Sequence, residues 1–355
     1  PYETFKDFYT KDYQRFVEYN IQDVELVDRL EDKMKLIELC LTMAYDYKVN
    51  YTDVYSQVRC WDTIIYNHLL TKNIQVPPRE DQIKDTQYEG AYVKDPQLGL
   101  HNWIVSFDLN SLYPHLIMQY NISPEMFLGV EPKAVGVENF LDERLNLKWA
   151  KDRNVTIAPN GAMFKRDKQG FLPELMEKMY TERVVYKKKA IEAKKEYQKT
   201  KDPIYSNEIS RCHNIQMAKK ISLNSAYGAI GNQYFRYFDV KQAEAITLGG
   251  QLSIRWVERD VNKFMNKLLG TDNKNYVVAS DTDSIYLKLD TLVEKVCKGK
   301  STKQIVDFLN KAAEEKIQKV IDDSYQNLAN YVNAYQQKMI MKREAIANKG
   351  IWVAK

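Results

Sequence analysis

The sequence predicts an α+β fold, in which helices pack on an antiparallel sheet and a helical hairpin is inserted between two strand-containing segments. Short apolar runs at residues 103–107 and 277–290 have the length and composition of strands, and the second has the pattern of a β-hairpin. Between them, residues 173–201 and 207–227 have helical periodicity on either side of a polar connector.

The composition is that of a soluble globular protein. The 355 residues are 44% hydrophobic and 28% charged, and their number predicts two or three domains. The 52 Lys and Arg residues against 48 Asp and Glu leave a net charge of +4, which is only a weak pointer to nucleic acid. Because no apolar run approaches the length of a membrane span, no membrane partner is expected.

Cysteine and histidine usage argues against disulfide and zinc chemistry. The four cysteines are scattered without a C-x-x-C pair, and there are only four histidines. A reducing compartment is therefore expected, namely the cytoplasm, or the host cytoplasm if the protein is viral. Neither end has the pattern of a natural terminus, so we expect a fragment or one piece of a split protein. The cysteines are Cys40, Cys60, Cys212 and Cys297.

The first third of the chain is predicted to be helical up to the first strand. Apolar residues recur three or four positions apart over residues 12–46, and residues 52–73 form a second amphipathic pattern. Two prolines at 77 and 78 end that pattern and open a polar connector. The run WIVSF at 103–107 predicts a buried strand, and a helix-like LYPHLIMQYN follows it.

The rest of the chain alternates between strands and helices. The first hairpin helix has Pro173 in its first turn, and the second ends at Gly228, a natural stop. The further expected elements are short strands within 127–172, a strand at 232–240, a helix at 241–269, helices over 302–334 and a late strand within 338–354.

Asp108 stands at the end of the apolar run WIVSF, where a carboxylate is costly unless something compensates its charge. The following residues open a helix, whose free N–H groups attract anions. A cation ligand beside a phosphate-binding helix start is one interpretation. An ordinary N-cap is the other, and this segment alone favours it.

Asp281 and Asp283 lie one residue apart between two β-prone runs. In an extended chain their side chains share a face, and two carboxylates repel unless a cation lies between them. A polar turn is the alternative, since the segment alone does not decide. With Asp108, however, the pair provides the strand-end carboxylates that a two-metal phosphoryl-transfer site needs.

The helical hairpin has two candidate binding faces. Lys220, Asn224 and Tyr227 lie at i, i+4 and i+7 and offer an ammonium, an amide and a phenol ring on one face. Arg183 and Lys187 lie at i, i+4 in the most basic run of the chain. The alternatives are a solvated stripe with Tyr227 in the core, and lysines that are merely solvated.

These segments follow the order of the motifs of family B DNA polymerases. SFDLNSLYPHLI (106–117) resembles motif A, KISLNSAYG (220–228) resembles motif B, and SDTDS (280–284) resembles motif C. YEGAYV, APNGAMFKRDKQGFLPEL, GNQYFRYFD and KREAIA extend the similarity, and YNIQDV (19–24) resembles the last exonuclease motif. The whole chain is most similar to the replicative polymerases of T-even-like bacteriophages.

The resemblance implies a polymerase palm, with a sheet and packed helices, into which a helical-hairpin fingers subdomain is inserted. Residues 1–45 would be the helical C-terminal remnant of an exonuclease domain, and 46–90 a helical connector. Residues 91–172 and 229–355 would form the palm and 173–228 the fingers, and the thumb is expected to be absent. The short linker between the fingers helices implies compact fingers.

The resemblance also assigns residues to template-directed DNA synthesis with two Mg²⁺ ions. Asp108 and Asp283 would bridge both metals, with the Leu109 carbonyl as a further ligand and Asp281 as an auxiliary acidic residue. The dNTP phosphates would bind backbone amides and fingers side chains. These nucleotide-binding groups are the amides of Ser111, Leu112 and Tyr113 and the side chains of Arg183, Lys187, Lys220 and Asn224.

Aromatic residues and the Y-x-G element complete the implied site. Tyr113 would pack beneath the deoxyribose and exclude a 2′-hydroxyl, and Tyr227 would pack against the nascent base pair. Tyr88 and Gly90 would contact the template strand. His115 departs from the small residue common at the end of motif A, and a modest effect is expected.

The implied partners are primer–template DNA and dNTPs, together with separate exonuclease or thumb chains and a sliding clamp. Tyr19 and Asp23 alone cannot hold two metals, so no 3′–5′ exonuclease activity is expected from this chain. The alternative function is a non-catalytic piece of a split polymerase that needs a thumb or exonuclease partner chain. A binding-only module is a third reading, against which the intact acidic set argues.

Overall fold

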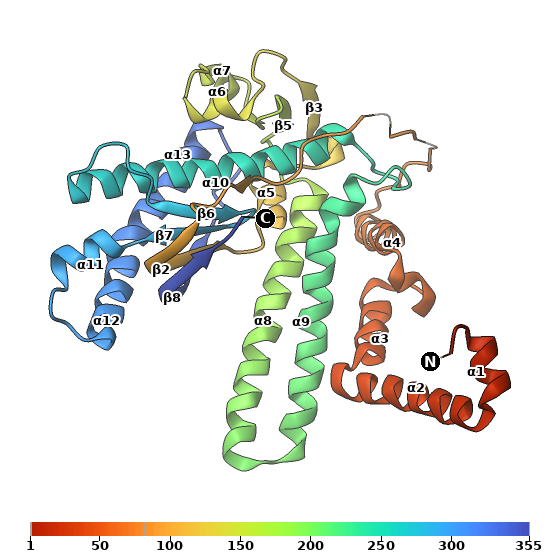
Figure 1. Ribbon diagram of the computed structural model, residues 1–355. Helices are drawn as coiled ribbons and strands as arrows, with labels where there is room; N and C mark the ends of the chain where they lie inside the picture. The colour runs from red at the N-terminus through yellow and green to blue at the C-terminus, as the bar shows by residue number, and fades with distance from the viewer. Residues whose placement is uncertain (1, 81, 85, 355) are drawn as a thin grey trace. The chain divides into compact units, whose positions relative to one another are not determined.

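The computed structural model describes residues 2–80, 82–84 and 86–354, which form two compact units. The first unit comprises residues 1–63 and 182–220, and the second comprises residues 64–181 and 221–355. Two long helices run from one unit into the other, so the units are joined by continuous helical backbone. Figure 1 labels the helices and strands of both units.

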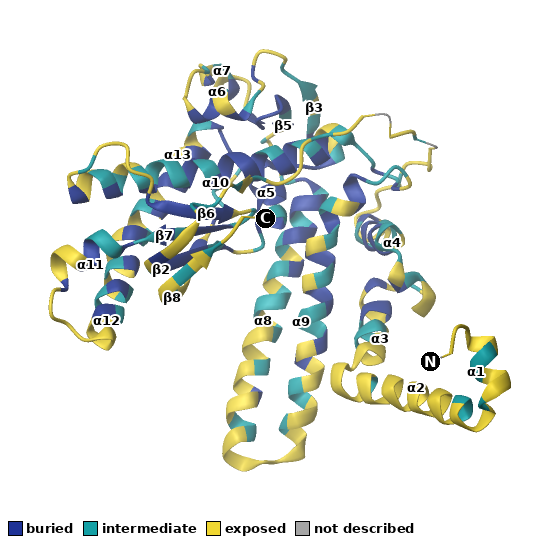
Figure 2. Ribbon diagram, in the orientation of Figure 1, coloured by how far each residue is buried: buried dark blue, intermediate teal, exposed yellow. Residues whose placement is uncertain are grey.

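The first unit is helical, as the periodicity predicts. The helix expected over residues 12–46 is divided at Lys35, which adopts a left-handed conformation with φ 53°. Val24, Val27 and Leu30 are all exposed, and Figure 2 shows α2 exposed over most of its length. The N-terminal helices are α1 (Phe5–Lys11), α2 (Tyr13–Met34), α3 (Leu36–Tyr47), the 3₁₀ turn η1 (Tyr51–Tyr55) and the start of α4 (Gln57–Leu70).

The core of the first unit joins α3 to the long helix α9 (Pro203–Ile230). The buried Tyr47 hydroxyl donates to the Ala218 carbonyl at 2.8 Å. The neighbouring Lys219 is also buried, and its ammonium pairs with Asp46 at 2.8 Å and with Glu182 of α8 (Phe171–Thr200) at 2.7 Å. A buried lysine is tolerated because two carboxylates compensate its charge.

The helical hairpin formed by α8 and α9 is confirmed, with two differences from expectation. Only Lys201 and Asp202 separate the helices, so the second helix begins four residues earlier than residue 207. Gly228 does not end α9, which continues to Ile230. Because Ala229 and Ile230 are buried, packing extends the helix past a glycine that would otherwise favour termination.

The second unit is built on a five-stranded antiparallel sheet in the order β1–β6–β7–β2–β8. The strand expected at 103–107 is the middle of the longer β2, which pairs with β7 on one side and β8 on the other. The hairpin expected at 277–290 is formed by β6 and β7. The strands are β1 (Val93–Lys94), β2 (Gly99–Leu109), β6 (Val277–Asp281), β7 (Ser284–Lys288) and β8 (Met341–Trp352).

Helix α10 (Val240–Leu269) is the main packing partner in this unit and contacts both α13 (Gln318–Tyr331) and α5 (Leu112–Tyr120). Asp239 caps its start by accepting from the Lys241 and Gln242 amides. Gly249 and Gly250 face α5, and a Cβ on Gly250 would lie 3.3 Å from the Tyr113 ring. The two glycines therefore allow α10 to approach the helix that follows Asp108.

A small second sheet has the order β3–β5–β4. Asn333, in a left-handed conformation after α13, holds this region by donating to the Ala150 and Val155 carbonyls at 3.2 and 2.8 Å. Its own carbonyl accepts from Thr156 at 2.9 Å. The elements are β3 (Phe127–Val130), α6 (Val137–Leu141), α7 (Lys148–Asp152), β4 (Val155–Ile157) and β5 (Ala162–Lys165).

One expected strand is wrong. Residues 232–239 form successive turns between α9 and α10, with backbone bonds from Phe235 to Asn232 and from Phe238 to Phe235, and Val240 begins α10. Phe235 and Tyr237 are buried with their rings against each other, so this aromatic-rich segment buries its side chains without forming a strand. The expected helices over 302–334 are confirmed as α12 (Thr302–Ala312), the π turn η3 (Ala313–Ile317) and α13, and the late strand as β8.

The remaining elements of this unit are the 3₁₀ turn η2 (Pro124–Met126) and α11 (Asp290–Val296). Within the described part of the chain, no helix combines the length and apolar character needed to cross a bilayer.

Candidate active site

Asp108 lies near the end of the interior strand β2, paired with Ser284 of β7 and with Lys342 of β8. The next amide, of Leu109, donates to the carbonyl of Asp283 at 2.8 Å. The backbone at Asp108 is therefore joined directly to the turn that carries Asp283. The sheet brings together two carboxylates that lie 175 positions apart in the sequence.

The turn between β6 and β7 has two residues, Thr282 and Asp283, and Asp281 pairs with Ser284 across it. Thr282 has φ 53°, a conformation that glycine prefers at the first position of such turns. A β-branched residue there is strained, and strained backbone of this kind clusters at functional sites. Two backbone hydrogen bonds stabilise the turn. The Thr282 amide donates to the Tyr92 carbonyl at 3.1 Å, and the Asp283 amide donates to the Asp281 carbonyl at 2.5 Å.

The carboxylates near this turn influence one another strongly. Burial raises the pKa of Asp108 to about 6, and the charges of Asp283 and Glu344 add to the effect. Burial also raises the pKa of Asp283, with Asp281 and Glu344 contributing in the same direction. Glu344, on β8, was not predicted as a site residue, because only the long-range pairing of β8 with β2 brings it here.

No cation of the described chain neutralises this cluster. None of the described residues forms an ion pair with the side chains of Asp108, Asp283 or Glu344. A backbone hydrogen bond within Asp283 favours the ionised form of that carboxylate, but burial outweighs it. Grouped carboxylates without a counter-charge are suited to binding a hard divalent cation.

The described residues contain no set of three His, Cys, Asp or Glu side chains arranged as a complete metal cage. Mg²⁺ sites in phosphoryl-transfer proteins need less than that, because one or two carboxylates suffice when water and substrate phosphates supply the other ligands. Asp108 and Asp283 are therefore chemically suited to a divalent-cation site in which other molecules supply the remaining ligands.

The start of α5 presents free backbone donors. Ser111 precedes the helix in a left-handed conformation with φ 47° and makes no side-chain cap. The amides of Ser111, Leu112 and Tyr113 have no acceptor among the described residues, as expected for the first turn of a helix. Three N–H groups thus remain available to an anion close to Asp108 in the sequence.

His115, the residue that departs from the family pattern, stabilises this helix start. It is buried edge-on against Tyr180 with ring centroids 4.6 Å apart, and its Nδ1 lies 2.9 Å from the Ser111 carbonyl oxygen. Burial lowers its pKa, so the ring is neutral near pH 7. His115 therefore helps to hold the Ser111 turn and adds no charge to the site.

Three tyrosine-containing segments meet beside the carboxylates. The rings of Tyr113 and Tyr227 lie 4.8 Å apart between centroids, and the Tyr227 hydroxyl contacts that of Tyr88 at 3.3 Å. Burial raises the pKa of Tyr113, and the nearby Asp283 adds to this. The Gly90 carbonyl accepts from Gln251 of α10 at 2.8 Å, which fixes the segment that carries Tyr88.

The other predicted site residues are divided between the two units. Asp281 and Asn224 are exposed in the second unit. Arg183, Lys187 and Lys220 belong to the first unit, where Lys187 and Lys220 are exposed, so their approach to the carboxylates stays a prediction.

In the first unit, the predicted exonuclease-motif pair lies one helical turn apart on α2. The charge of Asp23 and a hydrogen bond to it raise the pKa of Tyr19, so the two side chains are neighbours. The absence of nuclease activity from this pair alone stays a prediction.

Comparison with known proteins identifies relatives of this chain. A family model described as DNA polymerase family B matches residues 49–344. The DNA-directed DNA polymerase of Escherichia phage RB69 is 33% identical over 97% of this chain, and that of Enterobacteria phage T4 is 32% identical over the same share. DNA polymerase 1 of Pyrococcus abyssi is 32% identical over 63% of this chain and 24% of its own length. The chain spans 43% of the length of each phage relative.

Proposed function

Because this chain belongs to DNA polymerase family B, we propose that it carries the nucleotidyl-transfer centre for template-directed DNA synthesis. One observation supports this most strongly: the Leu109 amide donates to the Asp283 carbonyl, which brings Asp108 and Asp283 together in a cluster that forms no ion pair with any described cation. The reaction is attack of a primer 3′-hydroxyl on the α-phosphate of a dNTP, with pyrophosphate as the leaving group.

Asp108, Asp283 and the Leu109 carbonyl would hold two Mg²⁺ ions, and Asp281 has an auxiliary part. When bound, the ions activate the attacking oxygen and neutralise charge on the leaving group. The charge of Glu344 adds to the raised pKa of both main carboxylates and so increases the need for positive charge at this cluster. We add Glu344 to the acidic set on this ground.

The triphosphate would bind at the start of α5. The free amides of Ser111, Leu112 and Tyr113 provide donors for the β- and γ-phosphates, as helix starts do for other anions. Further contacts to the triphosphate would come from the helical hairpin. These are the side chains of Arg183, Lys187, Lys220 and Asn224.

The tyrosines would select the substrate. The Tyr113 ring would pack under the deoxyribose and clash with a 2′-hydroxyl. Tyr227, against Tyr113 and hydrogen-bonded to Tyr88, would pack on the nascent base pair. Tyr88 and Gly90 would contact the template strand. Catalysis in such a site is mainly positioning and charge neutralisation.

In this proposal residues 91–172 and 229–355 form the palm and residues 173–228 the fingers, with residues 1–45 from an exonuclease domain and 46–90 a connector. The substrates are primer–template DNA and dNTPs in the cytoplasm. A sliding clamp and thumb or exonuclease polypeptides are the proposed partners.

A second candidate is a piece that becomes active only with a partner chain. It is favoured by the exposed apolar side chains of α2, among them Val24, Val27 and Leu30. It is also favoured by the relatives, which are more than twice as long as the matched region.

The test is a primer-extension assay with Mg²⁺, using this chain alone and with added thumb and exonuclease fragments. Extension by the parent, reduced about 10³-fold or more in Asp108→Ala and Asp283→Ala, supports the proposed centre. Asp307→Ala, an exposed carboxylate on α12, is the matched control. Extension only with added fragments supports the second candidate. Undiminished extension by either active-site variant refutes the site assignment.

A further inference from the structure

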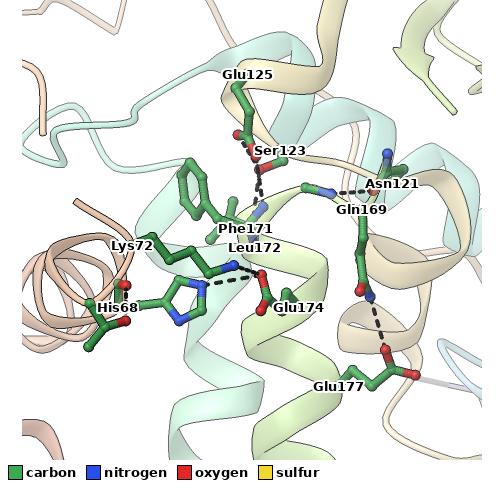
Figure 3. Close-up of polar contacts among 12 residues, drawn as sticks. His68, Lys72, Asn121, Ser123, Glu125, Gln169, Phe171, Leu172, Glu174 and Glu177 are labelled. Carbon is green, nitrogen blue, oxygen red and sulfur yellow. Dashed lines mark hydrogen bonds and ion pairs between the residues drawn. The ribbon is translucent and has the colours of Figure 1, made fainter. Parts of the chain in front are cut away.

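The start of α8 is fixed by side chains from the segment that follows α5 (Figure 3). Glu125 accepts from the Phe171 amide at 2.7 Å, and Ser123 accepts from the Leu172 amide at 3.4 Å while donating to Glu125 at 2.6 Å. Asn121 accepts from the Gly170 amide at 2.9 Å. The first donors of α8 are therefore occupied by protein groups, and the helix start is not open to a ligand.

Two carboxylates in the first turns of α8 pair with cations from two other elements. Glu174 pairs with Lys72, beyond the end of α4, and its Oε2 lies 3.4 Å from His68 Nε2 (Figure 3). Glu177 accepts from Lys338 at 2.7 Å and from Gln169 at 2.9 Å. We call these two carboxylates and their four partners the α8 socket.

The α8 socket is connected to the elements that carry the acidic cluster. The Lys338 amide donates to Gln119 Oε1 at 2.9 Å, and the Tyr335 amide donates to the Gln119 carbonyl at 2.9 Å. Gln119 is fully buried on α5, and β8 begins three residues after Lys338. One polar chain thus joins α8 to the helix after Asp108 and to the strand of Glu344.

The candidate phosphate-binding residues lie farther along α8, toward its C-terminal end. Arg183 and Lys187 follow Glu177 by six and ten positions in the same uninterrupted helix. At 1.5 Å per residue, Lys187 lies about 15 Å from Glu177 along the axis. A tilt of about 10° at Glu177 would therefore displace Lys187 by about 2.6 Å, enough to lose a hydrogen bond.

We propose that Glu174 and Glu177 are positioning residues for nucleotide binding, which set the direction of α8 through the α8 socket. This inference rests on the proposed function, because it assigns to Arg183 and Lys187 the binding of the triphosphate. The two carboxylates touch no substrate and act through the helix that carries those cations.

Both ion pairs of the α8 socket are partly exposed to solvent. The side chains of Lys338 and Glu177 are 23% and 42% exposed, and those of Lys72 and Glu174 are both 39% exposed. Pairs of this exposure contribute little to stability. Their loss should therefore affect nucleotide binding while global unfolding changes little.

The experiment measures single-nucleotide incorporation and the binding of a fluorescent dNTP by the full chain, with any fragment that supports extension. We expect Glu177→Gln and Lys338→Met to raise KM for dNTP about five- to tenfold, with kcat changed less than twofold. The urea midpoint should stay close to that of the parent. Glu174→Gln should act in the same direction.

The charge-swap variant Glu177→Lys/Lys338→Glu separates orientation from general damage. It should return KM to within about threefold of the parent, because the pair is restored with its sign reversed. Glu315→Gln, which breaks an exposed pair between Lys311 of α12 and Glu315 of the π turn η3, is the matched control and should leave KM unchanged.

Unchanged KM in both single variants overturns the proposal, and so does a KM increase that the charge swap fails to reduce. If either of these two results is obtained while the parent incorporates nucleotide, the proposed function stands and the α8 socket does not orient α8. A parent that neither incorporates nor binds dNTP, even with added fragments, overturns both.

Discussion

Replacement of Asp108 by Asn should stabilise the metal-free protein. Moving the pKa from its ordinary 3.8 to about 6 corresponds to about 3 kcal/mol of cost to the ionised form. Because the side chain is only half-buried, solvent screening reduces this to about 1–2 kcal/mol. The folded state binds the carboxyl proton of Asp108 more tightly than the unfolded state does. The loss of unfolding free energy is therefore absent below pH 3.8, grows as the pH rises and is complete above about 6.

Urea unfolding in EDTA at pH 7.5 and pH 4.5 tests this reasoning. Asp108→Asn should gain about 1–2 kcal/mol at pH 7.5 and about one-third of that at pH 4.5. Adding Mg²⁺ should stabilise the parent and stabilise the variant much less. Asp307→Asn, as the exposed control, should change neither value. A variant that is no more stable than the parent at pH 7.5, or whose gain is the same at both pH values, would falsify the account of the acidic cluster.

Three further outcomes are expected. Lys219→Met should lose about 3 kcal/mol of unfolding free energy, because it leaves two carboxylates without their buried cation. The adjacent, exposed Lys220 is the control: Lys220→Met should change the unfolding free energy by less than about 0.5 kcal/mol but raise KM for dNTP. Tyr113→Ala should raise the rNTP/dNTP ratio of kcat/KM at least about tenfold while Tyr113→Phe does not, and an unchanged ratio in the alanine variant removes the steric role. Asn333→Ala should lose about 2–4 kcal/mol in urea unfolding, because two buried carbonyls lose their donor, and a loss below 1 kcal/mol contradicts this.

Local sequence patterns were sufficient for most elements of the fold. The β-hairpin around Asp281 and Asp283, the strand at 103–107 and the helical hairpin all depend on short-range periodicity, and all are confirmed. The strand expected at 232–240 is wrong because aromatic residues, which are common in strands, can also be buried in consecutive turns. The helix stop at Gly228 failed because packing of the next two residues outweighed the preference of glycine.

The candidate site was only partly accessible to sequence reasoning. Asp108 and Asp283 could be paired because each follows an apolar strand, and the sheet does join their backbones. Glu344 could not be found in this way, since it lies within an alternating strand whose partner is more than two hundred positions away. The strain at Thr282 was also hidden, because threonine is ordinary in strands and its φ depends on the turn geometry.

Because β2 is an interior strand of its sheet, only certain openings of the structure can disturb Asp108. Since β2 is paired along both edges, its amides should exchange with solvent deuterium only when the whole second unit opens, whereas the two-residue β1 should exchange by fraying. Asp108 and the Leu109–Asp283 bond lie within this slowest-exchanging part. Heating should therefore leave the acidic cluster assembled until the unit itself unfolds, so thermal inactivation and global unfolding should coincide.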